Sequence, residues 1–167
     1  LLRDEIDLAV HSAKDLAPAV PEGLTILAVG HRQDARDVLI SKSDRSIFEL
    51  PSGARLGTSS PRREAQIKVI RPDVKMVPIR GNVDTRLRKA KSTDFDGVVL
   101  AAAGLARLDR LSEVTEYLNP REVTPDVGQG TLVAEVRDED RAVQEMLSTI
   151  ISPPTDRAFR AERAFLK

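Results

Sequence analysis

Arginine and hydroxyl side chains gather at two places where an apolar, strand-like run gives way to a helix. The first stretch is Thr58-Ser59-Ser60-Pro61-Arg62-Arg63, and the second is Arg80-Gly81-Asn82-Val83-Asp84-Thr85-Arg86. In each, the helix start offers backbone N–H groups and the positive end of the helix dipole beside arginine side chains. Because arginine grips carboxylates and phosphates through two parallel hydrogen bonds, the pair of stretches predicts a polyanion or polycarboxylate site. Either stretch alone is also what a capped surface helix looks like.

A carboxylate lies beside cations just after the apolar run Ile6–Val10, in the stretch His11-Ser12-Ala13-Lys14-Asp15. A carboxylate among cations is suited to hold or move a proton, which is what general acid–base catalysis needs. The alternative is a local ion pair between Lys14 and Asp15. Arg107 is a further candidate cation, although a single arginine at such a place is also typical of an exposed helix.

Several kinds of site are not predicted. The two histidines, His11 and His31, have no ligand-like neighbours in the sequence, so we expect no metal site. No stretch has the glycine pattern of a dinucleotide-binding loop or of a phosphate-binding loop with its lysine. Cysteine is absent, which excludes disulfides, thiolate zinc sites and a cysteine nucleophile within this chain.

The composition argues against nucleic acid and membrane as partners. The 167 residues contain 26 basic and 26 acidic side chains, so the net charge is zero, whereas nucleic-acid coats carry a basic surplus. Aromatic residues make up 3%, too few for a platform on which bases stack. No apolar run approaches the roughly 18 residues of a membrane span. Arginines outnumber lysines 19 to 7, which favours recognition of carboxylates or phosphates.

The hydrophobic pattern alternates between short strands and helices. Strands are predicted at 6–10, 24–29, 38–41, 54–57, 74–79, 97–101 and 131–136, and helices at 61–70, 83–91, 105–111, 141–151 and 157–167. Strands that alternate with helices of about ten residues indicate parallel βαβ units, so the fold class is α/β. In such sheets ligands bind beyond the carboxyl ends of the strands, which is where the polar stretches fall.

Six stretches of this chain resemble the porphobilinogen deaminase family, the hydroxymethylbilane synthases of tetrapyrrole and haem biosynthesis. They occur in the family's order over nearly the whole chain: IDLAVHSAKD (6–15), LGTSSPRR (56–63), IRGNVDTRL (79–87), DGVVLAAAGLARL (96–108), VGQGTLVAEV (127–136) and RAERAFL (160–166). Any one of them is a weak signal, but six in order are strong.

The resemblance implies a transferase that condenses four porphobilinogen molecules head to tail, with release of ammonia, on a dipyrromethane primer. It implies that Asp15 is the catalytic carboxylate, which stabilises the cationic intermediates. It also implies a set of cofactor and substrate contacts: Ser12, Lys14, Thr58, Ser59, Ser60, Arg62, Arg63, Arg80, Gly81, Asn82, Arg86, Arg107 and Gln129. The cysteine that anchors dipyrromethane in the family is expected beyond Lys167.

The family fold implies two lobes like those of periplasmic binding proteins, with mainly parallel βαβ sheets, and a smaller third domain. On that map residues 1–35 are part of lobe 1, 36–123 form a complete lobe 2, 124–152 are the hinge and return segment, and 153–167 begin the third domain. We therefore expect the chain to be part of a longer protein, lacking an N-terminal portion and most of the third domain. That parent protein is expected to be a cytoplasmic monomer.

The sequence is consistent with two functions. The first is the parent deaminase, with this chain inactive by itself because no cysteine is available for a thioether. The second is a carboxylate-binding α/β domain of periplasmic-binding-protein type that performs no chemistry.

Overall fold

The computed structural model describes residues 1–166 and divides the chain into two compact units. Unit 1 consists of residues 1–35 and the segment that starts at Asp126, and unit 2 consists of residues 36–125. Whether these units correspond to lobes of a longer protein stays a prediction, as does the assignment of residues 153–167 to a third domain.

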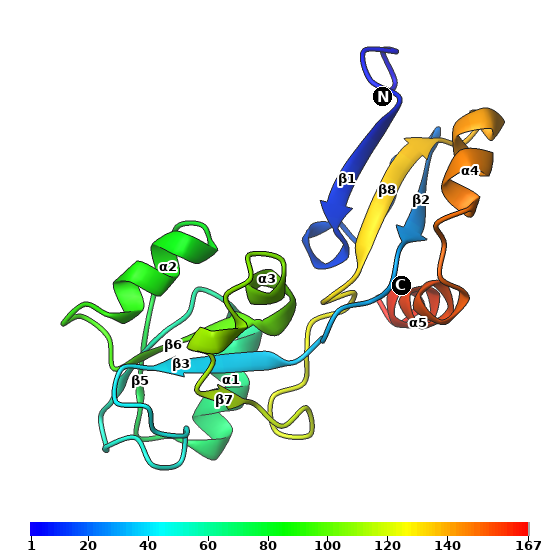
Figure 1. Ribbon diagram of the computed structural model, residues 1–167. Helices are drawn as coiled ribbons and strands as arrows, with labels where there is room; N and C mark the ends of the chain where they lie inside the picture. The colour runs from blue at the N-terminus through cyan, green and yellow to red at the C-terminus, as the bar shows by residue number, and fades with distance from the viewer. Residues whose placement is uncertain (167) are drawn as a thin grey trace. The chain divides into compact units, whose positions relative to one another are not determined.

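Unit 1 is built on a three-stranded sheet of order β1-β8-β2, shown in Figure 1. The strands are β1 (Leu8–Ser12), β2 (Leu24–Val29) and β8 (Leu132–Arg137). Both pairings are antiparallel, so β8, which comes late in the chain, lies between two strands from its beginning. Side chains alternate across β8, with Val133 on one face and Ala134 and Val136 on the other.

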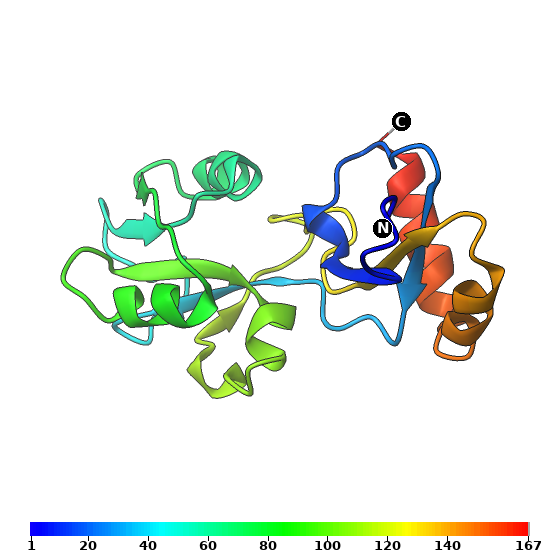
Figure 2. The same cartoon turned by 90° about the horizontal axis from the view of Figure 1, so that it is seen from above.

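Each face of this sheet is covered by one helix. Leu147 of α4 (Arg141–Ser148) packs against Ala134 and Val136. Phe159 of α5 (Pro153–Ala164) packs against Val133 on the other face, and Figure 2 shows α5 alongside β2. The sequence predicted this helix from residue 157, but α5 starts four residues earlier, at Pro153. Proline fits the first turn of a helix because no backbone N–H is needed there.

Unit 2 is built on a five-stranded sheet of order β5-β4-β6-β3-β7. The strands are β3 (Asp37–Ser41), β4 (Arg55–Gly57), β5 (Lys75–Val77), β6 (Gly97–Ala101) and β7 (Glu116–Tyr117). β4 pairs with β5 and β6 in parallel, whereas β3 runs antiparallel to both β6 and β7.

The α/β class is confirmed, but the prediction of mainly parallel sheets is wrong. The sheet of unit 1 is antiparallel throughout, and the sheet of unit 2 is mixed. A parallel neighbour requires a long crossover, usually a helix, and the chain supplies one between β4 and β5 and another between β5 and β6. In unit 1, β1 and β2 run in the same direction, joined by a segment whose regular structure is the three-residue helix η1 (Ala13–Asp15), but β8 returns from later in the chain and lies between them, antiparallel to both. Hydrophobic periodicity reports that a strand exists but says nothing about its direction.

Helices lie on both faces of the unit 2 sheet (Figure 1), which produces two cores. Val38, Ile40, Val98 and Leu100 face α2 (Val83–Ala90) and α3 (Ala102–Ala106). Leu39 and Val99 point the other way, towards α1 (Pro61–Ile70). Because the strands are buried on both sides, their sequences read as continuous apolar runs. The helix predicted at 105–111 was misplaced, because α3 follows β6 directly and the short helix η2 (Leu111–Glu113) is separate.

A buried arginine joins the loop that follows β3 to the end of α1. Arg71 donates hydrogen bonds to the carbonyl oxygens of Ile47 and Leu50, the latter at 3.0 Å. Its guanidinium also forms two hydrogen bonds with Asp73, at 2.8 and 2.7 Å. These hydrogen bonds lower the pKa of Asp73 to about 2, so the pair is fully charged at neutral pH. Arg71 therefore holds an irregular loop against the core of α1.

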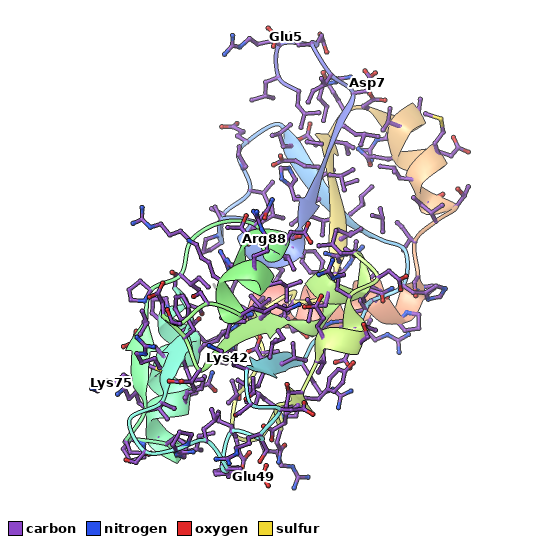
Figure 3. All side chains as sticks on the ribbon, turned by 60° about the vertical axis from the view of Figure 1, so that its left-hand side comes forward. Glu5, Asp7, Lys42, Glu49, Lys75 and Arg88 are labelled. Carbon is purple, nitrogen blue, oxygen red and sulfur yellow. The ribbon has the colours of Figure 1, made fainter. Side chains whose placement is uncertain are left out.

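Arg71→Met is expected to destabilise unit 2 by about 3 kcal/mol, because it leaves the buried carbonyl oxygens of Ile47 and Leu50 without their donor. Tyr117, the single tyrosine of the chain, lies in β7, so its fluorescence reports the unfolding of this unit in urea. Arg88→Met is the control, because Arg88 is exposed on α2 (Figure 3) and its loss should cost less than about 0.5 kcal/mol. Equal unfolding midpoints for the two variants would contradict this role of Arg71.

Candidate functional site

The two arginine-rich stretches of unit 2 meet at one edge of its sheet. β4 and β5 are parallel neighbours, with Gly57 opposite Val77, so both strands end at the same edge. The Thr58 N–H donates to the carbonyl oxygen of Val77 at 3.0 Å and carries the pairing one residue further. We call this region the carboxyl edge; it comprises residues 58–60, residues 78–82 and the start of α1 and α2.

The first loop of the carboxyl edge is shaped by its own hydroxyl groups. The Ser60 side chain caps α1 by accepting from the Arg63 N–H at 3.4 Å. The buried Thr58 hydroxyl accepts from the Ser60 N–H at 3.2 Å. The Ser59 hydroxyl reaches the second loop, where it bonds the backbone of Ile79. The N-terminal turn of α1 is therefore held in one position by its neighbours.

The second loop is equally constrained. Asn82 caps α2 by accepting from the Thr85 N–H at 2.9 Å. Arg86 donates through Nε to the Gly81 carbonyl oxygen at 2.8 Å. Gly81 has a φ of +118°, and an added Cβ would lie 2.6 Å from the Thr85 side chain, so only glycine fits. Arg80 is exposed at the tip of this rigid turn.

Beneath the carboxyl edge, Arg62 and Arg63 share one buried carboxylate. Asp37 is fully buried, and its Oδ1 accepts from Nε and Nη2 of Arg63 at 3.0 and 2.8 Å. Its Oδ2 accepts from Nη2 of Arg62 at 2.8 Å. Arg63 also donates to the carbonyl oxygen of Val99, and Arg62 to that of Thr124. The two arginines predicted as ligands of carboxylates thus already bind a carboxylate of the protein itself.

The sequence predictions missed Asp37 because they placed β3 in a parallel sheet. In a parallel sheet the first residue of a strand lies at the edge away from the carboxyl ends. Since β3 is antiparallel to β6, Asp37 instead lies opposite Ala101, the last residue of β6. The available signal was an acidic residue directly before a fully buried apolar run, because a buried charge needs a partner.

Unit 2 thus gathers most of the predicted contacts at one edge of its sheet: Thr58, Ser59, Ser60, Arg62, Arg63, Arg80, Gly81, Asn82 and Arg86. Arg107 is exposed at the end of α3, which starts where β6 ends at the same edge. This arrangement brings the N-termini of α1 and α2 and the exposed side chain of Arg80 to one region, a chemistry suited to a molecule with several carboxylates.

In unit 1 the remaining predicted residues lie on two adjoining segments. Ser12 ends β1, and Lys14 and Asp15 form η1, where Asp15 is exposed. The Ala13 N–H donates to the Thr131 carbonyl oxygen at 3.0 Å, which joins η1 to the segment that contains Gln129. The Gln129 side chain is buried, and its amide donates to the Ala35 carbonyl oxygen at 2.6 Å.

An ion pair that the sequence did not indicate supports this part of unit 1. Arg32 and Glu162 form two hydrogen bonds, and Arg32 Nε also donates to the Gln129 carbonyl oxygen at 3.0 Å. Glu162 accepts in addition from the Gly128 N–H at 2.7 Å. α5 therefore anchors the segment beside η1. The pair joins residues 130 positions apart, so no local pattern points to it.

The histidines have ordinary surroundings. His11 Nε2 lies 3.2 Å from a carboxylate oxygen of Glu135, and His31 is exposed. Within residues 1–166, no three His, Cys, Asp or Glu side chains are grouped as a metal ion would require. Over the same residues, no helix has the length and apolar character needed to cross a bilayer.

The fold is α/β and resembles the lobes of periplasmic binding proteins. The regulatory domain of the transcriptional activator MexT from Pseudomonas aeruginosa matches with a TM-score of 0.54, at 15% identity, over 90% of this chain and 74% of that one. A Salmonella typhimurium periplasmic binding protein with high arginine specificity matches with a TM-score of 0.52, at 12% identity, over 95% and 73%. At such identities the likeness concerns the fold alone.

Sequence comparison identifies the family. The family model for porphobilinogen deaminase, dipyromethane cofactor binding domain, matches residues 1–145. Porphobilinogen deaminases of Thermus thermophilus and Geobacillus kaustophilus are 50% and 51% identical to the whole chain, which covers 56% and 54% of their lengths. The chain belongs to the porphobilinogen deaminase family, which confirms the resemblance drawn from the six stretches. It spans about half the length of the curated relatives it matches.

Asp37→Asn is expected to destabilise unit 2 by about 3 kcal/mol, because it leaves the buried guanidinium group of Arg63 and the partly buried one of Arg62 without their carboxylate. The measurement is thermal unfolding followed through Tyr117, where a shift of about 6–12 °C corresponds to this loss in a protein of such size. Asp94→Asn, at an exposed position of the same unit, is the matched control and should shift the midpoint little. A midpoint for Asp37→Asn like that of the control would show that the buried carboxylate is dispensable.

Proposed function

We propose that this chain is the cofactor-holding and substrate-holding part of a hydroxymethylbilane synthase. The complete protein would join four porphobilinogen molecules head to tail, releasing one ammonia at each addition. The observation that carries this proposal is the carboxyl edge of unit 2, found in a chain of the porphobilinogen deaminase family. Porphobilinogen carries an acetate and a propionate group, so each addition brings two more carboxylates into the site.

The donors of the carboxyl edge suit a dipyrromethane cofactor, whose side chains are carboxylates. When bound, dipyrromethane supplies the primer to which pyrrole units are added. Arg80 and the first turns of α1 and α2 would hold its carboxylates through charge-assisted hydrogen bonds. The proposed contacts with cofactor and growing chain are Ser12, Lys14, Thr58, Ser59, Ser60, Arg62, Arg63, Arg80, Gly81, Asn82, Arg86, Arg107 and Gln129.

Asp15 is proposed as the catalytic carboxylate. Loss of ammonia from porphobilinogen leaves a cation conjugated with the pyrrole nitrogen, and a fixed carboxylate nearby stabilises that charge. Asp15 is exposed at the end of η1 and is therefore accessible to a substrate. The first residue of η1, Ala13, is held by its hydrogen bond to the Thr131 carbonyl oxygen.

The intact mass of the complete protein tests the cofactor. Mass spectrometry under denaturing conditions should show an excess equal to one dipyrromethane, because the family's primer is held by a covalent bond. Replacing the anchoring cysteine of the complete protein should remove that excess. A bare polypeptide mass would instead favour a non-catalytic carboxylate-binding domain, a role that the absence of cysteine within these 167 residues also favours for this chain by itself.

Asp15→Asn in the complete protein is expected to lower kcat at least about 100-fold, because the neutral amide does not stabilise the developing cation. Ammonia release or product absorbance measures turnover, and the unfolding curve should not change because Asp15 is exposed. Glu22→Gln, at another exposed acidic position of unit 1, is the control and should keep normal turnover. Normal turnover by Asp15→Asn would remove Asp15 from the catalytic role.

A further inference from the structure

The Ser59 side chain joins the two loops of the carboxyl edge. Its hydroxyl donates to the Ile79 carbonyl oxygen at 2.8 Å and accepts from the Ile79 N–H at 3.0 Å. A hydroxyl has both a donor and acceptor sites, so it can satisfy both groups of one residue at once. Ser59 thus occupies the place that a backbone rung would take in a longer strand.

A side chain is needed at this position because the backbone ladder stops here. The last regular pair of the two strands is Gly57 with Val77. Beyond it, Pro78 has no N–H to donate, and the chain after Thr58 turns away to begin α1. The Ser59 hydroxyl therefore carries the connection between the strands past the point where main-chain atoms can.

The position of Ile79 determines what this connection controls. Ile79 is 2% exposed and packs in the core that includes Leu87 of α2. The next residue is Arg80, whose side chain is exposed at the edge, so a shift at Ile79 moves Arg80 directly. In the first loop, Ser59 is followed by Ser60, the N-cap of α1. The Ser59 hydroxyl therefore connects the start of α1 with the loop that carries Arg80.

We propose that Ser59 is a positioning residue, whose hydroxyl sets the spacing between the N-terminal turn of α1 and Arg80 so that both bind carboxylates of one ligand. The ligand side of this inference rests on the proposed function. The neighbouring hydroxyls have a different role, because Ser60 bonds within α1 and Thr58 bonds within its own loop. Because its one hydroxyl proton is donated to the Ile79 carbonyl oxygen, Ser59 acts on the ligand through the backbone of Ile79, which refines the direct contact proposed for it above.

Amide hydrogen exchange of the 167-residue chain tests the connection directly. In Ser59→Ala the Ile79 N–H loses its acceptor, so its exchange should accelerate by about 10-fold or more. Ser59→Thr keeps the hydroxyl and should restore slow exchange, since Ser59 is exposed enough for a methyl group. Ser60→Ala, which removes a hydroxyl one residue away, should leave the Ile79 amide unchanged. Unchanged exchange at Ile79 in Ser59→Ala would overturn the proposal.

Titration with porphobilinogen, followed through the amide signals of Ser60 and Gly81, tests the consequence for binding. The dissociation constant should rise about 10-fold in Ser59→Ala and return to normal in Ser59→Thr, whereas equal affinity in Ser59→Ala would overturn the positioning role. If the chain without substitutions shows no change in the amide signals of Ser60 or Gly81, the proposed binding function of these loops is wrong. The hydrogen-exchange measurement still tests the connection between Ser59 and Ile79 in that case. Should Ser59→Ala not fold, as Tyr117 fluorescence would reveal, Ser59→Cys offers a weaker donor and acceptor for both comparisons.

Discussion

The buried carboxylate of Asp37 is the group on which the arrangement of unit 2 depends. Removing a carboxylate from water is costly unless cations and hydrogen bonds replace the lost hydration. Arg62 and Arg63 supply that replacement from the first turn of α1, which fixes the start of this helix against β3. The link from Arg62 to the Thr124 carbonyl oxygen extends the same connection to the last residues of the unit. The position of the carboxyl edge therefore depends on the hydrogen bonds of Asp37 with Arg62 and Arg63.

Both units use internal hydrogen bonds to hold the segments that carry the proposed ligand contacts. In unit 2 the caps of α1 and α2 and the hydrogen bonds of Ser59 hold the two loops in place, and Arg80 of the second loop is exposed. In unit 1 the Arg32–Glu162 pair and the buried Gln129 amide anchor the segment beside η1. Donors that are already in place do not have to be ordered when a polycarboxylate arrives, so less binding free energy is lost to entropy.

Local signals predicted the elements well where the chain carries its own start and stop residues. The helix predicted at 61–70 agrees with α1, because Ser60 and Pro61 specify its start and Pro72 prevents its continuation. The strand predicted at 24–29 agrees with β2. Predictions failed where the determinant lies far away in sequence: the direction of β3 depends on its pairing with β6, and the Arg32–Glu162 pair depends on packing across unit 1.

The sequence by itself determined the family, through six stretches in order, and the residue types at the strand ends, since arginine, serine and helix starts are local properties of the chain. It also determined that no thioether anchor lies within these 167 residues. Only the tertiary structure decided how those residues are used. Strand direction brought Asp37 to the carboxyl edge, where it binds Arg62 and Arg63, and the end of the β4–β5 ladder brought the Ser59 hydroxyl to Ile79. Both outcomes depend on pairing between distant segments, which a one-dimensional pattern does not encode.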